Sequence, residues 1–255
     1  MKKIWITVLL AAAMSGNLKA EEVGDWNSAY VSVSASYFEL KDRINHGFVF
    51  IGPDAGLAFG IRNMRAGRYF DYSLSLDGGG KIALDSWGFR WAISPVNFAY
   101  AFNVHTANET ALYAGPAFFV NYSIQNYPDM HSGWLNWMTN YSLGLHLAGR
   151  TNVRGKTLNV QMRNAILSLT SRPESQRDQY YFSLRASDIL GDTHSNMRLS
   201  PIYDYVQTDL RAEVFLGERS SLAYLFHYTK YVDAPTFQQL SHGLKYTFYF
   251  NSITW

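Results

Sequence analysis

Residues 55–62 read AGLAFGIR. In this stretch apolar side chains alternate strictly with small or polar ones, since Ala55, Leu57, Phe59 and Ile61 take turns with Gly56, Ala58, Gly60 and Arg62. A period of two places successive side chains on opposite faces of a β-strand. The stretch therefore predicts a strand with one apolar face and one face of small or polar groups.

The same alternation recurs along the chain in segments of about ten residues that turn residues separate. It is clear at residues 70–76 and 98–105, and again at residues 206–216, which read VQTDLRAEVFL. Repeated alternating segments predict a single antiparallel transmembrane up-and-down β-barrel, all-β, with the apolar face toward lipid and the other face toward the lumen. A soluble β-sandwich also alternates, but its outward face would be polar.

Counting the segments predicts about 12 strands, with 10 to 14 as the range. They are expected at residues 28–38, 54–63, 68–76, 81–93, 97–105, 110–124, 134–148, 156–169, 178–187, 204–216, 220–231 and 238–250. This count puts the long connection 125–133 on the periplasmic side, where barrels keep turns short. Ten strands would follow if residues 78–80 formed an internal bend, and fourteen if residues 191–201 held two short strands.

The N-terminus has the order of a secretory signal peptide. Lys2 and Lys3 precede an apolar run at residues 4–14, and Leu18-Lys19-Ala20 offers a cleavage site after Ala20. The run is shorter than the roughly 20 residues that a spanning helix needs. We therefore expect residues 1–20 to be removed and residues 21–255 to form one barrel domain.

Composition and charge exclude several classes of protein. Aromatic residues make up 16% of the chain, with 18 Tyr, 16 Phe and 7 Trp, and aromatic girdles are typical of outer-membrane barrels. Removing the three signal lysines leaves 19 basic against 20 acidic residues, a net charge of about −1, so no nucleic acid partner is implied. With no cysteine, neither a disulfide framework nor a thiolate metal site is expected.

The C-terminal segment has an alternating row made by Leu240, Leu244, Tyr246, Phe248 and Phe250, and the chain ends in Trp255. This row resembles the assembly signal of bacterial outer-membrane β-barrel proteins, although Trp255 lies on the opposite parity from Phe250. The resemblance covers one strand and indicates the superclass. It implies the outer membrane of a Gram-negative cell, contact with its lipid, and the barrel-assembly machinery as a partner.

The inward face carries the candidate functional residues. On strict parity the lumen-lining charges are Arg62, Asp71, Arg90, Arg163, Arg185, Asp209, Arg211, Glu213 and Lys245. Six basic against three acidic groups would favour anions in a wet lumen, which predicts a narrow, porin-like passive channel for small polar or anionic solutes. The alternative is a closed interior in which these charges pair with one another.

Two other kinds of function stay open. A lipid-modifying hydrolase would need serine and histidine on one face, but His194 and Ser195 are adjacent, and Ser142 and His146 lie ~13 Å apart along a strand. No catalytic residue, metal site or cofactor is therefore predicted. A surface barrel would act through its loops, for which the connections 41–53 and 188–203 are candidates, with no partner indicated.

Overall fold

The computed structural model describes residues 26–65, 67–84, 86–107, 109–129, 135–153, 156–174, 185–217, 219–233 and 235–250. The predicted signal peptide at residues 1–20 lies outside the described residues. So does most of the strand predicted at 178–187.

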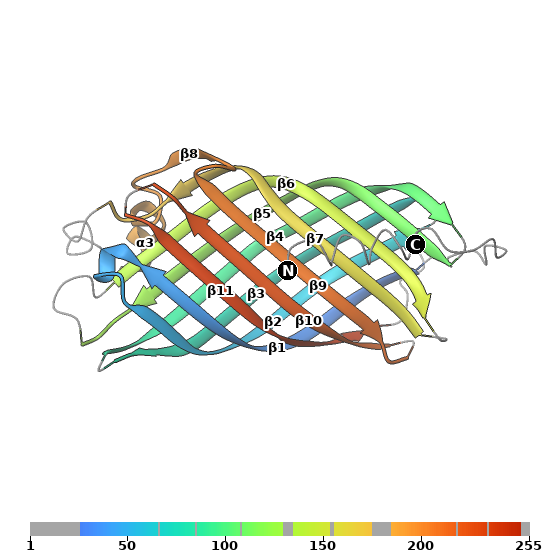
Figure 1. Cartoon of the computed structure of the whole chain (residues 1–255), viewed down its shortest axis with the longest axis horizontal. Helices are drawn as coiled ribbons and strands as arrows, with labels where there is room; N and C mark the ends of the chain where they lie inside the picture. The colour runs from blue at the N-terminus through green and yellow to red at the C-terminus, as the bar shows by residue number, and fades with distance from the viewer. Residues whose placement is uncertain are drawn as a thin grey trace, which may run out of the picture.

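Within these residues ten long antiparallel strands form a closed barrel (Figure 1). The ring closes where the first strand pairs with the last and where β6 pairs with β7. The strands are β1 (Trp26–Asp42), β2 (Val49–Arg65), β3 (Arg68–Ala83), β4 (Ser86–Ala107), β5 (Thr110–Asn126), β6 (Leu135–Val153), β7 (Lys156–Ser171), β9 (Tyr205–Phe215), β10 (Ser220–Tyr231) and β11 (Phe237–Tyr249). The prediction of an all-β transmembrane barrel is confirmed.

The count differs from twelve because the three strands predicted at 68–76, 81–93 and 97–105 are two strands, β3 and β4, and because the strand predicted at 178–187 adds no strand to the described barrel. Two predicted turns lie inside β3 and β4. Residues 77–80 run through β3, where Gly79 allows close approach to β2, since a Cβ there would stand 2.1 Å from the Pro53 carbonyl oxygen. Residues 94–97 lie within β4, where the register against β5 shifts between Ile93 and Val96. Pro95 has no N–H to donate, so this position suits a bulge.

The two ends of the barrel differ in their connections. At one end, here called the turn end, lie the short links at residues 66–67, 108–109, 154–155 and 216–219, together with the start of β1 and the end of β11. The other end, the loop end, holds the short link 84–85 and the longer connections 43–48, 127–134, 172–204 and 232–236, with a 3-10 helix, η1 (Arg43–Asn45), in the first of the longer ones. With ten strands the long connection after β5 moves to the loop end, which removes the conflict with barrel topology. Short turns mark the periplasmic side.

The strands are steeply inclined to the barrel axis (Figure 1). The tilt can be followed by moving from Ser34 on β1 to β6 in both directions around the barrel, always from a residue to its paired neighbour on the next strand. In the direction of β2 this path ends at Met138 on β6. The route through β11 reaches Arg150, twelve residues further along the same strand. This offset in the pairing register fixes the tilt of the strands and the radius of the barrel together. It also brings residues that are far apart in the sequence to the same height inside the lumen.

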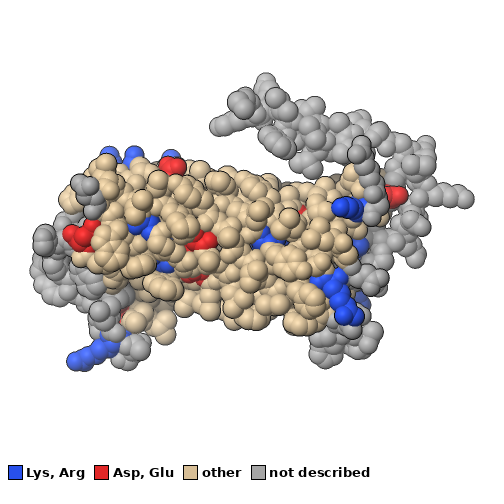
Figure 2. All heavy atoms as spheres, turned by 90° about the horizontal axis from the view of Figure 1, so that it is seen from below, with Lys and Arg blue, Asp and Glu red and all other residues tan. Residues whose placement is uncertain are grey.

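The outer wall is apolar. Leu57, Phe59 and Ile61 are each more than a third exposed, as are the outward apolar residues of the neighbouring strands. Figure 2 shows few charged side chains along the middle of one face. Aromatic side chains stand at both edges of this belt, with Trp87 and Trp91 toward the loop end and Phe248 and Phe250 toward the turn end. Within the described residues no helix is long and apolar enough to cross a membrane.

The connection between β7 and β9 carries two further elements. The helix α3 (Ala186–Asp192) packs its Ile189 against Leu135 and Trp137, which point outward from β6, so the helix lies against the outer wall. After it, β8 (Arg198–Pro201) pairs with the loop-end half of β7, while β9 pairs with the turn-end half. β8 and β9 therefore occupy one position in the wall. Residues 186–187, predicted as the end of a strand, are instead the first turn of α3.

Candidate functional site: a closed polar chamber in the lumen

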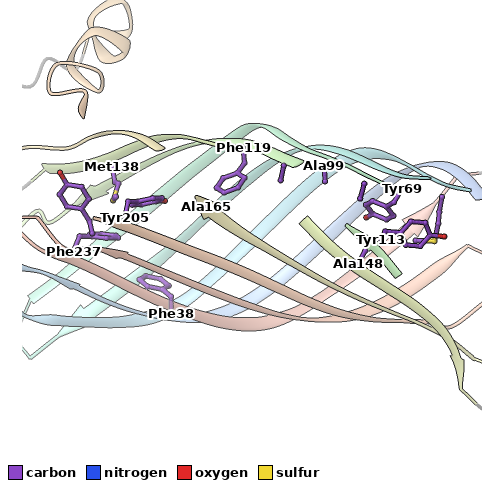
Figure 3. Packing of buried hydrophobic residues seen from close by; sticks show 14 of the residues in the cluster. Phe38, Tyr69, Ala99, Tyr113, Phe119, Met138, Ala148, Ala165, Tyr205 and Phe237 are labelled. Atoms are coloured by element: carbon purple, nitrogen blue, oxygen red, sulfur yellow. The ribbon is translucent and has the colours of Figure 1, made fainter. Parts of the chain in front are cut away.

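The inward faces of the strands enclose a cavity of about 230 Å³ near the middle of the barrel. Small side chains make room for it, because Ser34, Ala58, Ser73 and Ser75 line the cavity where larger residues would fill it. We call this cavity the chamber. Bulky buried side chains gather at either end of the lumen, as Tyr69 and Tyr113 at one end and Tyr205 and Phe237 at the other show (Figure 3).

The turn-end layer closes the chamber on the side of the short turns, and Arg62 is its centre. The Arg62 Nη1 donates to Glu213 Oε2 at 2.8 Å and to the Tyr249 hydroxyl at 3.0 Å, while its Nε donates to Asp71 Oδ2 at 3.0 Å. The side chains of Arg62 and Glu213 are completely buried. One guanidinium thus joins strands from opposite sides of the barrel.

Neutral donors complete this layer. Asp71 accepts from the hydroxyls of Tyr30 at 3.0 Å and Tyr69 at 2.9 Å. Glu213 accepts from Tyr249 at 2.6 Å and also pairs with Arg211. Buried charges are tolerated when each is paired and hydrogen-bonded in this way.

The loop-end layer closes the other side with a second set of polar groups. Arg172 Nη2 lies 2.8 Å from Asp42 Oδ1, and its guanidinium carbon lies 5.6 Å and 5.5 Å from the ring centroids of Tyr231 and Phe237. Asn136 also donates to Asp42.

A further cation lies beside this group. Lys81 donates to Gln125 at 3.2 Å, with its Nζ 3.8 Å from the Tyr127 ring centroid. The lumen is therefore blocked by side chains above and below the chamber.

Inside the chamber some charges are paired and others are not. Arg90 pairs with Asp54, and Asp209 pairs with His227, whose other ring nitrogen lies 2.8 Å from the Thr229 hydroxyl. Among the described residues, Arg163, Lys245 and Asp77 also line the chamber but form no ion pair. The chamber is thus lined by two basic side chains and one acidic side chain that make no direct ion pair with another described residue.

The structure brings eight of the nine predicted lumen residues together. Arg62, Asp71 and Glu213 form the turn-end layer, and Arg90, Arg163, Asp209, Arg211 and Lys245 line the chamber. Arg185 lies apart, because it is the exposed N-cap residue of α3.

Parity reasoning missed Asp42, Asp54, Asp77, Lys81 and Arg172. With three acids and two bases added, and Arg185 removed, the predicted basic surplus largely disappears.

Three of the missed residues lie outside the predicted strands. Asp42 and Arg172 lie at or just beyond the ends of β1 and β7, past the predicted strand ends, and Asp77 lies in a predicted turn. The alternating pattern does continue through Asp42 and Asp77, since Asp42 has the parity of Ser34 and Asp77 that of Asp71. Extending these strands by parity until the next turn would have found both. A register shift in β7 between Ala165 and Leu167 reverses the parity before Arg172, so the same extension would have placed Arg172 on the outer face.

The serine and histidine candidates do not form a nucleophile and base. Ser142 Oγ lies 2.7 Å from Ser168 Oγ, and the His146 ring stacks on Tyr69 at 5.0 Å. His194 Nε2 lies 2.6 Å from the Tyr141 hydroxyl, while Ser195 donates to a backbone carbonyl. In the part of the chain that the structure describes, no serine hydroxyl is hydrogen-bonded to a histidine ring.

Asp209, His227 and Thr229 follow one another in the order of orienting acid, base and hydroxyl nucleophile. However, Thr229 is 5% exposed and does not line the chamber. The His227 ring has both nitrogens in contact with a partner, which is the arrangement of a satisfied lumen histidine.

A closed barrel of tilted antiparallel strands, with a continuous apolar outer wall and a polar interior, defines the class. The protein is a bacterial outer-membrane β-barrel. No family model matches the chain, and no curated protein matches it.

Three solved structures with similar folds are distant in sequence. The translocator domain of the autotransporter NalP from Neisseria meningitidis has a TM-score of 0.44 and 9% identity, covering 95% of this chain and 93% of that chain. An outer-membrane channel from Pseudomonas putida F1 has a TM-score of 0.38 and 12% identity, covering 92% of this chain and 99% of that chain. The outer-membrane protease OmpT from Escherichia coli has a TM-score of 0.39 and 6% identity, and the match again covers 92% of this chain and 99% of that chain. The class rests on the barrel itself and its apolar belt.

Proposed function

We propose that this outer-membrane barrel is a narrow passive channel for small polar or anionic solutes, and that the arrangement with both layers in place is its closed state. The observation that carries the proposal is the chamber. A barrel that served only as a scaffold would fill its interior and pair its charges, because protein interiors are close-packed and unpaired buried charges are costly. Here 230 Å³ is left open, and Arg163, Lys245 and Asp77 line it without an ion pair among the described residues.

The nature of the two layers supports the proposal. They consist of side chains from the barrel strands and of Arg172, which follows β7 directly. Rotation of a few long side chains therefore changes the width of the lumen without unfolding the wall. Tyr69 is well placed for this, since its hydroxyl contacts Asp71 and its ring fills the lumen beside His146.

Single-channel conductance of the refolded protein in a planar bilayer tests this proposal, with reversal potential under a salt gradient to report ion selectivity. We expect discrete openings from the wild type and larger or longer openings from Y69A, which removes one ring from the turn-end layer. The matched control is Y224A, because Tyr224 is 45% exposed on the outer wall. Absence of openings from folded wild type and folded Y69A would overturn the proposal.

A surface role is the second candidate, and one observation favours it. The loop end is tied together across connections, because Arg198 pairs with both Glu174 and Asp233 while α3 is docked on the outer wall. Ordered loops suit recognition better than mobile ones. Replacing residues 186–197 by a short Gly-Ser link would abolish binding of a cell-surface partner but leave channel conductance unchanged.

A further inference from the structure

We infer that the chamber binds small zwitterions, in which a carboxylate and an ammonium group are separated by one or two carbon atoms. The inference rests on the proposed channel, because a solute reaches the chamber only when one of the two layers opens. It follows from where the unpaired charges stand around the lumen.

The cationic side of the chamber lies on β7, β9 and β11. Arg163 pairs in register with Asp209, the inward neighbour of Arg211 on β9, and Lys245 lies two strands from β9. All three basic side chains line the chamber. Arg163 and Lys245 form no ion pair among the described residues, so their charges are available to a carboxylate.

The anionic side lies across the lumen on β3. In the ring order β3 is five strands from β9 in both directions, so the two strands face each other. Asp77 lines the chamber from β3, and Ser73 and Ser75 add hydroxyls beside it. Asp71, also on β3, is already held by Arg62 and two tyrosines, which leaves Asp77 to meet a cation.

Arg90, beside β3, is paired with Asp54, and Asp209 on β9 is paired with His227. The charged side chains without an ion pair therefore create an electric field across the chamber, with its positive side on β7, β9 and β11 and its negative side on β3. A uniformly charged solute gains on one side and is repelled on the other, whereas a zwitterion can place each pole against the opposite charge. The chamber volume of about 230 Å³ corresponds to several water molecules at about 30 Å³ each. A molecule of about five to seven non-hydrogen atoms fits such a space.

Flux into proteoliposomes of four solutes that match in size tests the inference. Glycine is the zwitterion, glycolamide the neutral probe, glycolate the anion and glycinamide the cation. We expect saturable glycine flux that exceeds glycolamide flux about fivefold at low concentration, equivalent to about 1 kcal/mol. D77N should remove the preference for glycine over glycolate, and R163Q or K245Q should lower glycine flux. K230Q is the control, since Lys230 is exposed on the outer face of β10.

The outcomes separate the inference from the proposed function. Equal flux of all four solutes, or glycine flux that D77N leaves unchanged in folded protein, would overturn the zwitterion site while the channel stands. Preference for glycolate over glycine would overturn it in favour of a plain anion site. No flux of any solute through folded barrel would overturn both.

Discussion

Arg62 on β2 and Glu213 on β9 lie 151 residues apart in sequence, yet form an ion pair of 2.8 Å with both side chains completely buried. β2 and β9 are not neighbours in the sheet, so the contact spans the lumen. This ion pair is therefore the contact that most directly closes the lumen at the turn end.

Replacing Arg62 by methionine should destabilise the barrel by about 3–5 kcal/mol, because buried Asp71 would lose the cation that pairs with it and Glu213 would keep only Arg211. Urea unfolding in lipid vesicles, followed by tryptophan fluorescence, measures this loss. The double variant R62M/D71N should recover much of it, since Glu213 keeps its ion pair with Arg211 and no carboxylate of the layer is then left without a cation. R68M at the exposed turn end is the control, and a loss for R62M no larger than for R68M would contradict the role assigned to Arg62.

Lys81 should behave in the opposite way. It is buried and donates to Gln125, but forms no ion pair among the described residues. K81M keeps the volume and leaves Gln125 Oε1 bonded to the Tyr127 hydroxyl at 2.6 Å, so the free energy of unfolding should stay within about 1 kcal/mol or rise. K81A should cost about 2–4 kcal/mol through the void beside Tyr127. Equal destabilisation by both variants would show that the charge itself matters.

Gly79 and its neighbour Gly80 provide a test of the close approach between β2 and β3. A Cβ on Gly79 would stand 2.1 Å from the Pro53 carbonyl oxygen and 2.8 Å from the Asp54 Cα, whereas a Cβ on Gly80 meets nothing within 4 Å. G79A should therefore lower refolding yield and stability, and G80A should be tolerated. Heat-modifiable migration on SDS gels distinguishes folded from unfolded barrel for both variants. Equal yields would mean that the backbone relaxes there at little cost.

The docking of α3 should depend on Ile189 and not on the next residue. Ile189 packs against buried Leu135 and Trp137, while Leu190 is 62% exposed. I189D should release the helix and speed cleavage of the connection between β7 and β9 by added protease, since burying a carboxylate there is unfavourable. L190D should leave the cleavage rate near that of wild type. Similar rates for the two variants would argue against a fixed helix.

Much of the wall could be predicted from sequence, because alternation is a local property. The strand at residues 220–231 was placed with its observed bounds, and Arg62 and Glu213 were assigned to the lumen from parity alone. The errors arose where local turn chemistry competes with the pattern. Asp77-Gly-Gly-Gly80 has turn composition, yet pairing with β2 and β4 holds it extended. Ser94-Pro95 also has turn composition, but it lies at a register shift against β5 inside a strand that continues on both sides of it.

The closed state could not be predicted in the same way. Whether Arg62 meets Glu213 depends on the offset between strands around the ring, and one residue of shift changes which side chains share a level. Parity states which face a side chain takes, but not its height in the lumen. The outward docking of α3 is equally non-local, because it depends on Leu135 and Trp137, about fifty residues earlier.

The junction between β1 and β11 also bears on how quickly the molecule forms. Tyr30 pairs with Tyr249 and Asp42 with Phe237. This ladder therefore joins the first and the last strand of the described chain. Loop-closure entropy opposes such a contact until the intervening hairpins have brought the ends together. The hairpins are therefore expected to form first, and ring closure to be the slow, rate-limiting phase of folding. Until then two unpaired edges remain open to other chains.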